Sequence, residues 1–318
     1  MIKVGISGCG SLRAAELLRV LINHPDVELK WVSGGCPAGT RLDQIVPGII
    51  GECDLTLSSV ADLAEVDLVF LCGTRNEVAA RLSSIQLPDE LRVIDLSGSH
   101  NLDCGPEKPW IYGLSEMQRR VLVHEAHLVT VPGSAATAAL LALMPMARNM
   151  SLNNPLSVSV AVGTAMLPDK DKTLDGLSID DWARDQQEEV KLALAQCQTG
   201  FDQPVSLTVT PLAERRMLAA AVRFKCDVKG DMIRQLYEAY YEDHNFVFLV
   251  DRPIVAADVE NTNKCLIQLY KDESSGLLTV NAVMDVLLKG SVGTAVHAMN
   301  LMFGLHERVG LSLKGVGC

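Results

Sequence analysis

The sequence predicts an α/β protein of two domains, the first of which holds a Rossmann-like, doubly wound parallel sheet. A chain of 318 residues is too long to fold around one ordinary hydrophobic core and is about the length of two domains. In the first hundred residues, short apolar runs alternate with segments of helical spacing, which favours a parallel sheet covered by helices on both faces. Hydrophobic residues make up 48% of the chain and charged residues 21%, enough for sizeable cores.

The elements of the first domain follow from these runs. One helix is predicted over 14–23, where apolar residues recur every three or four positions. Four short apolar segments are predicted to be buried strands, at 3–7, 27–33, 67–72 and 92–96. In a sheet of this kind, ligands bind at the carboxyl ends of the strands.

The second half of the chain predicts an α+β domain with a mainly antiparallel sheet. Its strand-like runs are closely spaced, at 156–162, 205–210, 219–228, 246–250, 264–269 and 277–282. Helices are predicted over 179–196 and 231–241, and a last one over 291–303. We therefore expect a dinucleotide-binding-type domain over 1–133, completed by 290–318, and a substrate and dimerisation domain over 134–289.

Composition argues against several classes of partner. The net charge is −11 and no basic cluster with interleaved aromatic residues occurs, so we expect no nucleic-acid binding. No apolar stretch reaches the roughly 18 residues of a membrane span. The nine cysteines form no Cys-x-x-Cys pair and the chain begins directly with a strand-like run, which favours reduced thiols in a cytoplasmic protein. The histidine spacing suggests no metal site.

The loop after the first strand carries an incomplete dinucleotide fingerprint. Gly8 and Gly10 give the first two glycines, but Arg13 stands where the third is expected. The three glycines of this region, Gly5, Gly8 and Gly10, also suit an ordinary tight turn from a strand into a helix. The loop is therefore a weak indication of phosphate binding on its own.

A second segment, Val129 to Met146, has the layout of an active site. A strand tail runs through Pro132 and Gly133 into Ser134, and a long apolar helix follows. Ser134 is thereby predicted at a helix N-terminus, where the helix dipole favours negative charge and would suit a thiolate.

Several motifs in order resemble those of the N-acetyl-gamma-glutamyl-phosphate reductase family, relatives of aspartate-semialdehyde dehydrogenase. They are "IKVGISG", "AELLRVLINHPDVEL", "VIDLSG", "YGLSE", "PGSAATAALLAL" and "KGSVGTAVHAMNLMFGL". The resemblance covers nearly the whole chain. It implies an NADPH-dependent reduction of an acyl phosphate in arginine biosynthesis, through a cysteine thioester and with a histidine that handles protons. It also implies a homodimer or homotetramer formed through the second domain's sheet.

The residues at the positions of that chemistry differ. Ser134 stands at the family's cysteine and Gln186 at its histidine, and an amide cannot transfer protons at neutral pH. Ser11 and Ala14 replace later glycines of the phosphate loop, where a Cβ is expected to obstruct the pyrophosphate. Ser33 to Cys36 contains no arginine for the NADPH 2′-phosphate.

Other positions still match the family, so we expect weak binding of the cofactor. The candidate cofactor residues are Gly8, Gly10, Ser11, Ser97, Lys289 and Gly290, and Arg216 is the candidate substrate residue. The preferred hypothesis is a family member that has lost the reduction and binds a small acylated amino acid or a partner protein. Two alternatives stay open: acyl transfer or cyclisation on an acyl phosphate or carrier-bound amino acid, and an active NADP-dependent reductase.

Overall fold

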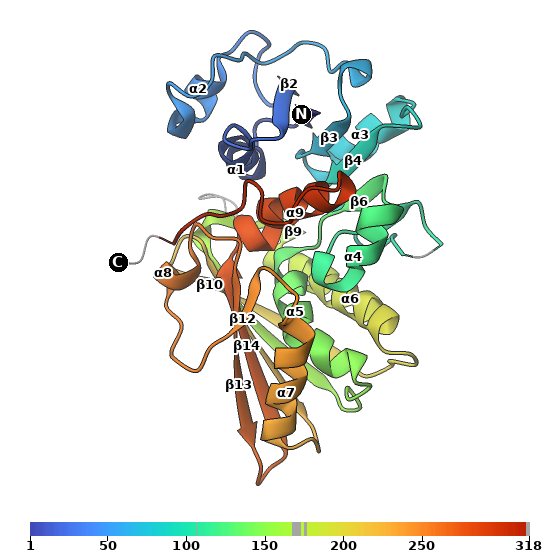
Figure 1. Ribbon diagram of the computed structural model, residues 1–318, viewed down its shortest axis with the longest axis vertical. Helices are drawn as coiled ribbons and strands as arrows, with labels where there is room; N and C mark the ends of the chain where they lie inside the picture. The colour runs from blue at the N-terminus through green and yellow to red at the C-terminus, as the bar shows by residue number, and fades with distance from the viewer. Residues whose placement is uncertain (106, 167–172, 175–176, 316–318) are drawn as a thin grey trace. The chain divides into compact units, whose positions relative to one another are not determined.

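The computed structural model describes residues 1–318 except 106, 167–172, 175–176 and 316–318, and it divides into two compact units (Figure 1). The first comprises Met1–Pro132 and Ser291–Ser312. The second comprises Gly133–Gly290 and the chain from Leu313 on. Each unit is built on a six-stranded sheet.

The first unit is a wholly parallel sheet in the order β2-β1-β3-β4-β6-β5. Its strands are β1 (Ile2–Ser7), β2 (Val27–Ser33), β3 (Leu68–Leu71), β4 (Arg92–Asp95), β5 (Trp110–Tyr112) and β6 (Leu128–Thr130). Its helices are α1 (Leu12–Leu21), α2 (Leu42–Ile45), α3 (Arg75–Ser84), α4 (Ser115–His124) and α9 (Gly293–Met302), with 3₁₀ turns at Pro47–Ile49 and Leu63–Glu65. The predicted doubly wound sheet is thus confirmed.

Burial on both faces explains why β3 reads as a continuous apolar run. All four of its residues are buried. Val69 and Leu71 pack with Val78 of α3 and with Trp31 and Trp110 in one core cluster. Residues alternate along a strand, so the other two residues of β3 face the opposite side of the sheet. A strand covered on both sides carries no polar alternation.

The second unit is a mixed sheet in the order β10-β7-β11-β14-β13-β12. Its strands are β7 (Leu156–Gly163), β10 (Val205–Leu212), β11 (Met217–Lys225), β12 (Val247–Leu249), β13 (Cys265–Asp272) and β14 (Leu277–Asp285). The three central pairings are antiparallel, as predicted, whereas the pairings at both edges, β10 with β7 and β12 with β13, are parallel. A two-stranded ribbon joins β8 (Thr173–Leu174) to β9 (Leu177–Ser178).

Three long helices of the second unit gather on one side of this sheet: α5 (Ser134–Arg148), α6 (Ile179–Cys197) and α7 (Gly230–Tyr241) (Figure 1). The short α8 (Ala256–Val259) lies on the other side, where Val259 packs with Leu266 and Val283. The unit also has a 3₁₀ turn at Thr164–Met166 and a π-helical turn at Leu288–Val292. The fourteen residues Ser134–Ala147 of α5 are all buried, so it is the central helix of the unit. This accounts for the apolar sequence after Ser134, because a helix covered all round has no polar face.

Candidate functional site

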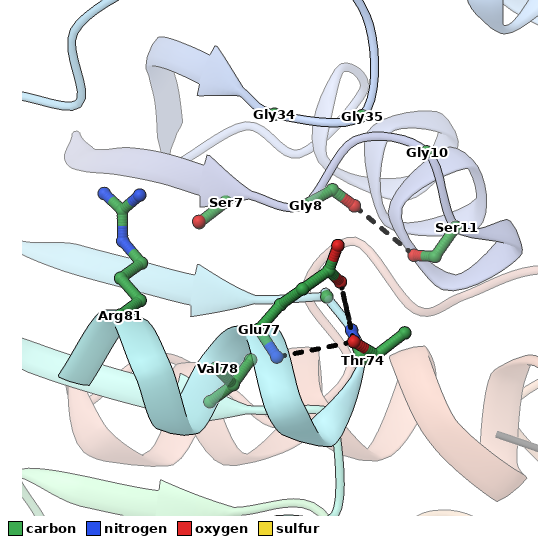
Figure 2. Close-up of a pocket in the computed structure, with 11 residues that line it drawn as sticks. Ser7, Gly8, Gly10, Ser11, Gly34, Gly35, Thr74, Glu77, Val78 and Arg81 are labelled. Atoms are coloured by element: carbon green, nitrogen blue, oxygen red, sulfur yellow. Dashed lines mark hydrogen bonds between the residues drawn. The ribbon is translucent and has the colours of Figure 1, made fainter. Parts of the chain in front are cut away.

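A cavity of about 520 Å³ lies at the carboxyl ends of the first three strands of the parallel sheet. It lies where β2 and β3 flank β1 on opposite sides, which is the switch point at which ligands bind in doubly wound folds. Three loops line it, those after β1, β2 and β3, together with the first two turns of α3 (Figure 2). The lining residues are Ser7, Gly8, Gly10, Ser11, Gly34, Gly35, Gly73, Thr74, Glu77, Val78 and Arg81.

Two glycines allow the loops of this cavity to approach each other closely. Gly35 has φ +83°, and a Cβ there would stand 2.3 Å from the Gly10 amide nitrogen. Gly8 has φ +98°, and a Cβ there would stand 2.4 Å from the Gly73 nitrogen. Both need a left-handed backbone and the absence of a side chain. Three loops that meet through bare backbone form the kind of wall against which a pyrophosphate can lie.

The two side chains expected to obstruct the pyrophosphate do not close this cavity. Ser11 is the N-cap of α1, and its Oγ accepts from the Ala14 amide at 3.1 Å. Ala14 is fully buried and does not line the cavity, so its methyl group belongs to the core. The expectation of obstruction by Ala14 is therefore wrong. A helix N-terminus with no acidic residue in its first turn remains open to an anion.

The α3 wall of the cavity carries opposite charges that do not pair. Glu77 belongs to a capping box: its Oε2 accepts from the Thr74 amide at 2.7 Å and from the Thr74 hydroxyl at 2.8 Å. These hydrogen bonds lower the pKa of Glu77, the amide contributing most. Arg81, one turn further on, forms no ion pair within the described residues, and its Nε is buried without a hydrogen-bond partner.

Ser97 lies outside the lining of this cavity, in a polar cluster at the end of β4. Asp95 is fully buried; its Oδ1 accepts from the Ser97 amide at 2.7 Å and from the Ser97 hydroxyl at 2.6 Å. Its Oδ2 is 2.8 Å from His100 Nδ1, and the His100 ring stacks on Trp110 with centroids 3.9 Å apart. Ser97 thus serves to hold Asp95.

In the second unit, Ser134 and Gln186 come together at the start of α5. Ser134 is the first residue of the helix, as predicted, and Gly133 is its N-cap. The Ala136 amide donates to Gln186 Oε1 at 3.0 Å, and the Gly133 amide donates to Glu189 Oε1 at 2.8 Å. Gln186 Nε2 in turn donates to Glu189 Oε2 at 3.3 Å. Two side chains of α6 therefore cap α5.

The Ser134 hydroxyl has no partner in this arrangement. Its side chain is buried, and Oγ makes no hydrogen bond within the described residues. Gln186 lies directly over Gly133, because a Cβ on Gly133 would stand 2.0 Å from Gln186 Nε2. A Cβ on Gly290 would stand 3.0 Å from Ser134 Cβ, so this turn packs against the serine. A serine needs an adjacent base to become a nucleophile, and an amide cannot be one.

Arg216 is bound to a buried carboxylate. Its Nε and one terminal nitrogen lie 2.7 and 3.1 Å from the two oxygens of fully buried Asp285. The same carboxylate accepts from the backbone amides of Asn261, Leu287 and Leu288. Arg216 thus helps to fix the end of β14, with its side chain 22% exposed.

Lys289 and Gly290 belong to the second unit and do not line the cavity of the first. Lys289 is fully buried, with Nζ 5.8 Å from the centroid of the Phe246 ring. In the described part of the chain, no group of three or more His, Cys, Asp or Glu side chains could hold a metal ion. Among the same residues, no helix is long and apolar enough to cross a membrane.

Comparison with known proteins gives a family for both units. Residues 3–124 match the family model described as semialdehyde dehydrogenase, NAD binding domain, and residues 185–285 match semialdehyde dehydrogenase, dimerisation domain. The chain is 34% identical over 322 residues to N-acetyl-gamma-glutamyl-phosphate reductase of Parabacteroides distasonis and 35% identical over 325 residues to that of Bacteroides fragilis, covering 99% of each protein. The chain belongs to the N-acetyl-gamma-glutamyl-phosphate reductase family.

Solved structures of similar fold have much lower sequence identity. Aspartate semialdehyde dehydrogenase II from Vibrio cholerae gives a TM-score of 0.73 at 15% identity, covering 96% of this chain and 99% of that one. A probable aspartate-semialdehyde dehydrogenase from Pseudomonas aeruginosa gives 0.73 at 16% identity, covering 95% and 98%. These likenesses concern the fold. The match to the semialdehyde dehydrogenase, NAD binding domain model spans every residue that lines the cavity.

Sequence reasoning missed most of the cavity wall contributed by α3. Thr74, Glu77, Val78 and Arg81 were not among the expected site residues, although all four line the cavity. The pattern Thr74-x-x-Glu77 directly after an apolar strand was the available signal, since it is a capping box. A helix that begins after the third strand must begin at the ligand-binding edge of the sheet.

Proposed function

We propose that this chain binds a dinucleotide in the first unit and does not carry out the thioester-mediated reduction that its family resemblance implies. In this proposal it acts as a binding protein for a small acylated amino acid or for a partner protein. The names of its relatives, reductases of N-acetyl-gamma-glutamyl phosphate, point to a ligand of that chemical class and to arginine biosynthesis.

One observation supports the proposed loss of the thioester-mediated reduction. The side chain that lies over the start of α5 is an amide, Gln186, and it is already bonded to the Ala136 amide and to Glu189. Ser134 Oγ has no hydrogen-bond partner among the described residues and hence no base to accept its proton. Without a thiolate, or a base to generate an alkoxide, no acyl intermediate forms at a useful rate.

Nucleotide binding is supported independently by the cavity of the first unit. Its backbone-lined loops, the N-terminus of α1 and the switch-point position fit a dinucleotide. The two halves of the proposal therefore rest on different units and can be tested separately.

The test is an activity assay beside a binding titration. Wild-type protein with NADPH and N-acetylglutamyl phosphate is expected to release no phosphate and oxidise no NADPH above background, while fluorescence titration shows NADPH bound. Turnover at an ordinary enzyme rate, about 1–1,000 per second, would contradict the proposal. The Ser134→Cys variant alone is expected to stay inactive, because Gln186 still cannot transfer protons. The Ser134→Cys, Gln186→His double variant carries both family residues and provides the matched comparison.

Acyl transfer without reduction is a second candidate, favoured by one observation. The amides of Ser134 and Ala135 belong to the first turn of α5, where helix N–H groups have no intrahelical acceptor. Two such N–H groups beside a hydroxyl can hold an oxyanion. Intact-mass analysis after incubation with acetyl phosphate would reveal an adduct on wild-type protein that Ser134→Ala lacks. Absence of any adduct would exclude this candidate.

The proposal includes a homo-oligomer in the cytoplasm. The match to a dimerisation domain supports the oligomer. The eight cysteines in the described chain are all free, which suits a reducing compartment. Sedimentation velocity is expected to give a dimer or tetramer, and a monomer at micromolar concentration would contradict it.

A further inference from the structure

The cavity of the first unit contains one cation whose charge nothing in the described chain neutralises. Arg81 lines the cavity from α3 and forms no ion pair there. The carboxylate best placed by sequence to pair with it is Glu77, four residues earlier on the same helix. Glu77 instead bonds to Thr74 at the start of α3 through both the amide and the hydroxyl. The capping box thus leaves the guanidinium available to a ligand.

Arg81 lies apart from the loop after β1, which is suited to a pyrophosphate. In Figure 2, Ser7 and Gly8 lie between Arg81 and Ser11, and the guanidinium lies on the side of Ser7 away from Gly8. A pyrophosphate held by Gly8, Gly10 and Ser11 would therefore occupy one end of the cavity, next to the N-terminus of α1. Arg81 would then meet a different anionic group of the same ligand.

The end of β2 contains no acidic residue that would exclude such a group. An acid there is the usual partner of a ribose 2′-hydroxyl, and it repels a phosphate at that position. Here β2 ends at Ser33, followed by Gly34 and Gly35, both of which line the cavity. Ser33 pairs with Ser7 in the sheet, and its buried hydroxyl lacks a partner in the described chain. The wall contributed by the end of β2 therefore offers hydrogen-bonding capacity without negative charge.

We propose that Arg81 is the residue that selects a 2′-phosphorylated dinucleotide, by binding the 2′-phosphate from α3. This inference rests on the proposed nucleotide binding and adds the residue that binds the 2′-phosphate. A guanidinium binds a phosphate through two parallel hydrogen bonds, which a lysine cannot reproduce. The charge that sequence analysis sought directly after β2 is then supplied from a helix about 45 residues later.

The experiment is a titration of NADPH and NADH into three proteins: wild type, Arg81→Gln and Arg120→Gln. Arg120 is an exposed arginine of α4 in the same unit, so its variant removes the same charge away from the cavity. Wild type is expected to bind NADPH at least tenfold more tightly than NADH. Arg81→Gln is expected to lose that preference by weakening NADPH alone, while Arg120→Gln keeps it. Thermal melting checks that each variant is folded.

The outcomes separate this inference from the proposed function. Binding of NADH and NADPH with equal affinity by wild type, or equal weakening of both in Arg81→Gln, would overturn the role of Arg81 and leave nucleotide binding in place. Failure of wild type to bind either nucleotide would overturn the proposed function and the inference with it. Titration with 2′-AMP and adenosine gives a second readout: only the 2′-AMP affinity should depend on Arg81, and dependence of the adenosine affinity would contradict the assignment.

Discussion

Replacing Gly35 by alanine should damage the cavity of the first unit by a mechanism that a second glycine can isolate. Gly35 and Gly39 have almost the same backbone conformation, with φ +83° and +85°. An alanine in this left-handed region costs about 1–2 kcal/mol at either position. At Gly39 a Cβ would meet nothing within 4 Å. At Gly35 it would stand 2.3 Å from the Gly10 nitrogen and 2.7 Å from its Cα, so one of the two loops must move.

The difference in the free energy of unfolding between Gly35→Ala and Gly39→Ala therefore measures only the cost of the steric contact. Forcing a methyl group into packed backbone costs about 1–3 kcal/mol. We expect Gly35→Ala to be less stable than Gly39→Ala by that amount in urea denaturation, and to lose NADPH binding that Gly39→Ala retains. Equal losses of stability in the two variants would show that the loops after β1 and β2 are not in the close contact described here.

Three further predictions concern buried polar groups. Ser134→Ala should leave stability within about 1 kcal/mol of wild type or raise it, because the lost hydroxyl makes no hydrogen bond; a larger loss in urea denaturation would reveal a missed partner. Arg216→Ala should cost about 3–5 kcal/mol, since it strips a buried carboxylate of its cation, whereas exposed Arg215→Ala should cost under about 0.5 kcal/mol. Burial and the neighbouring Cys36 raise the pKa of Cys9 to about 11. The unfolded thiol ionises first, so stability should fall from pH 9 to pH 11, and Cys9→Ala should flatten that fall; an unchanged slope would contradict it.

The fold was predictable because its signals are local. The run Val27–Ser33 predicted the bounds of β2, and the apolar spacing of α1, α6 and α7 predicted helices whose ends lie within two residues of those observed. The helix α3 was not predicted, because only Val78 of its ten residues is buried. A helix that exposes nearly all of its surface carries little hydrophobic periodicity.

The candidate site could be predicted only in part, since its contacts join distant segments. Ser134 at a helix start follows from the Pro-Gly turn before it and the apolar run after it. That Gln186 would lie on Gly133 and bond to Ala136 depends on how α6 packs against α5, fifty residues away. The bidentate pair of Arg216 with Asp285 joins positions sixty-nine residues apart. No pattern within one segment contains that information.

The contact between Gln186 and Gly133 restricts the order in which mutations can accumulate at the start of α5. A side chain at position 133 would displace the amide of Gln186 from its hydrogen bonds with Ala136 and Glu189, a cost that a smaller residue at position 186 would remove. Position 186 is free of this restriction, because shortening its side chain creates space. With a glutamine at position 186, packing alone therefore favours glycine at position 133, whether or not any chemistry requires it. Glycine at the start of this helix thus has a packing role that is separate from any catalytic one.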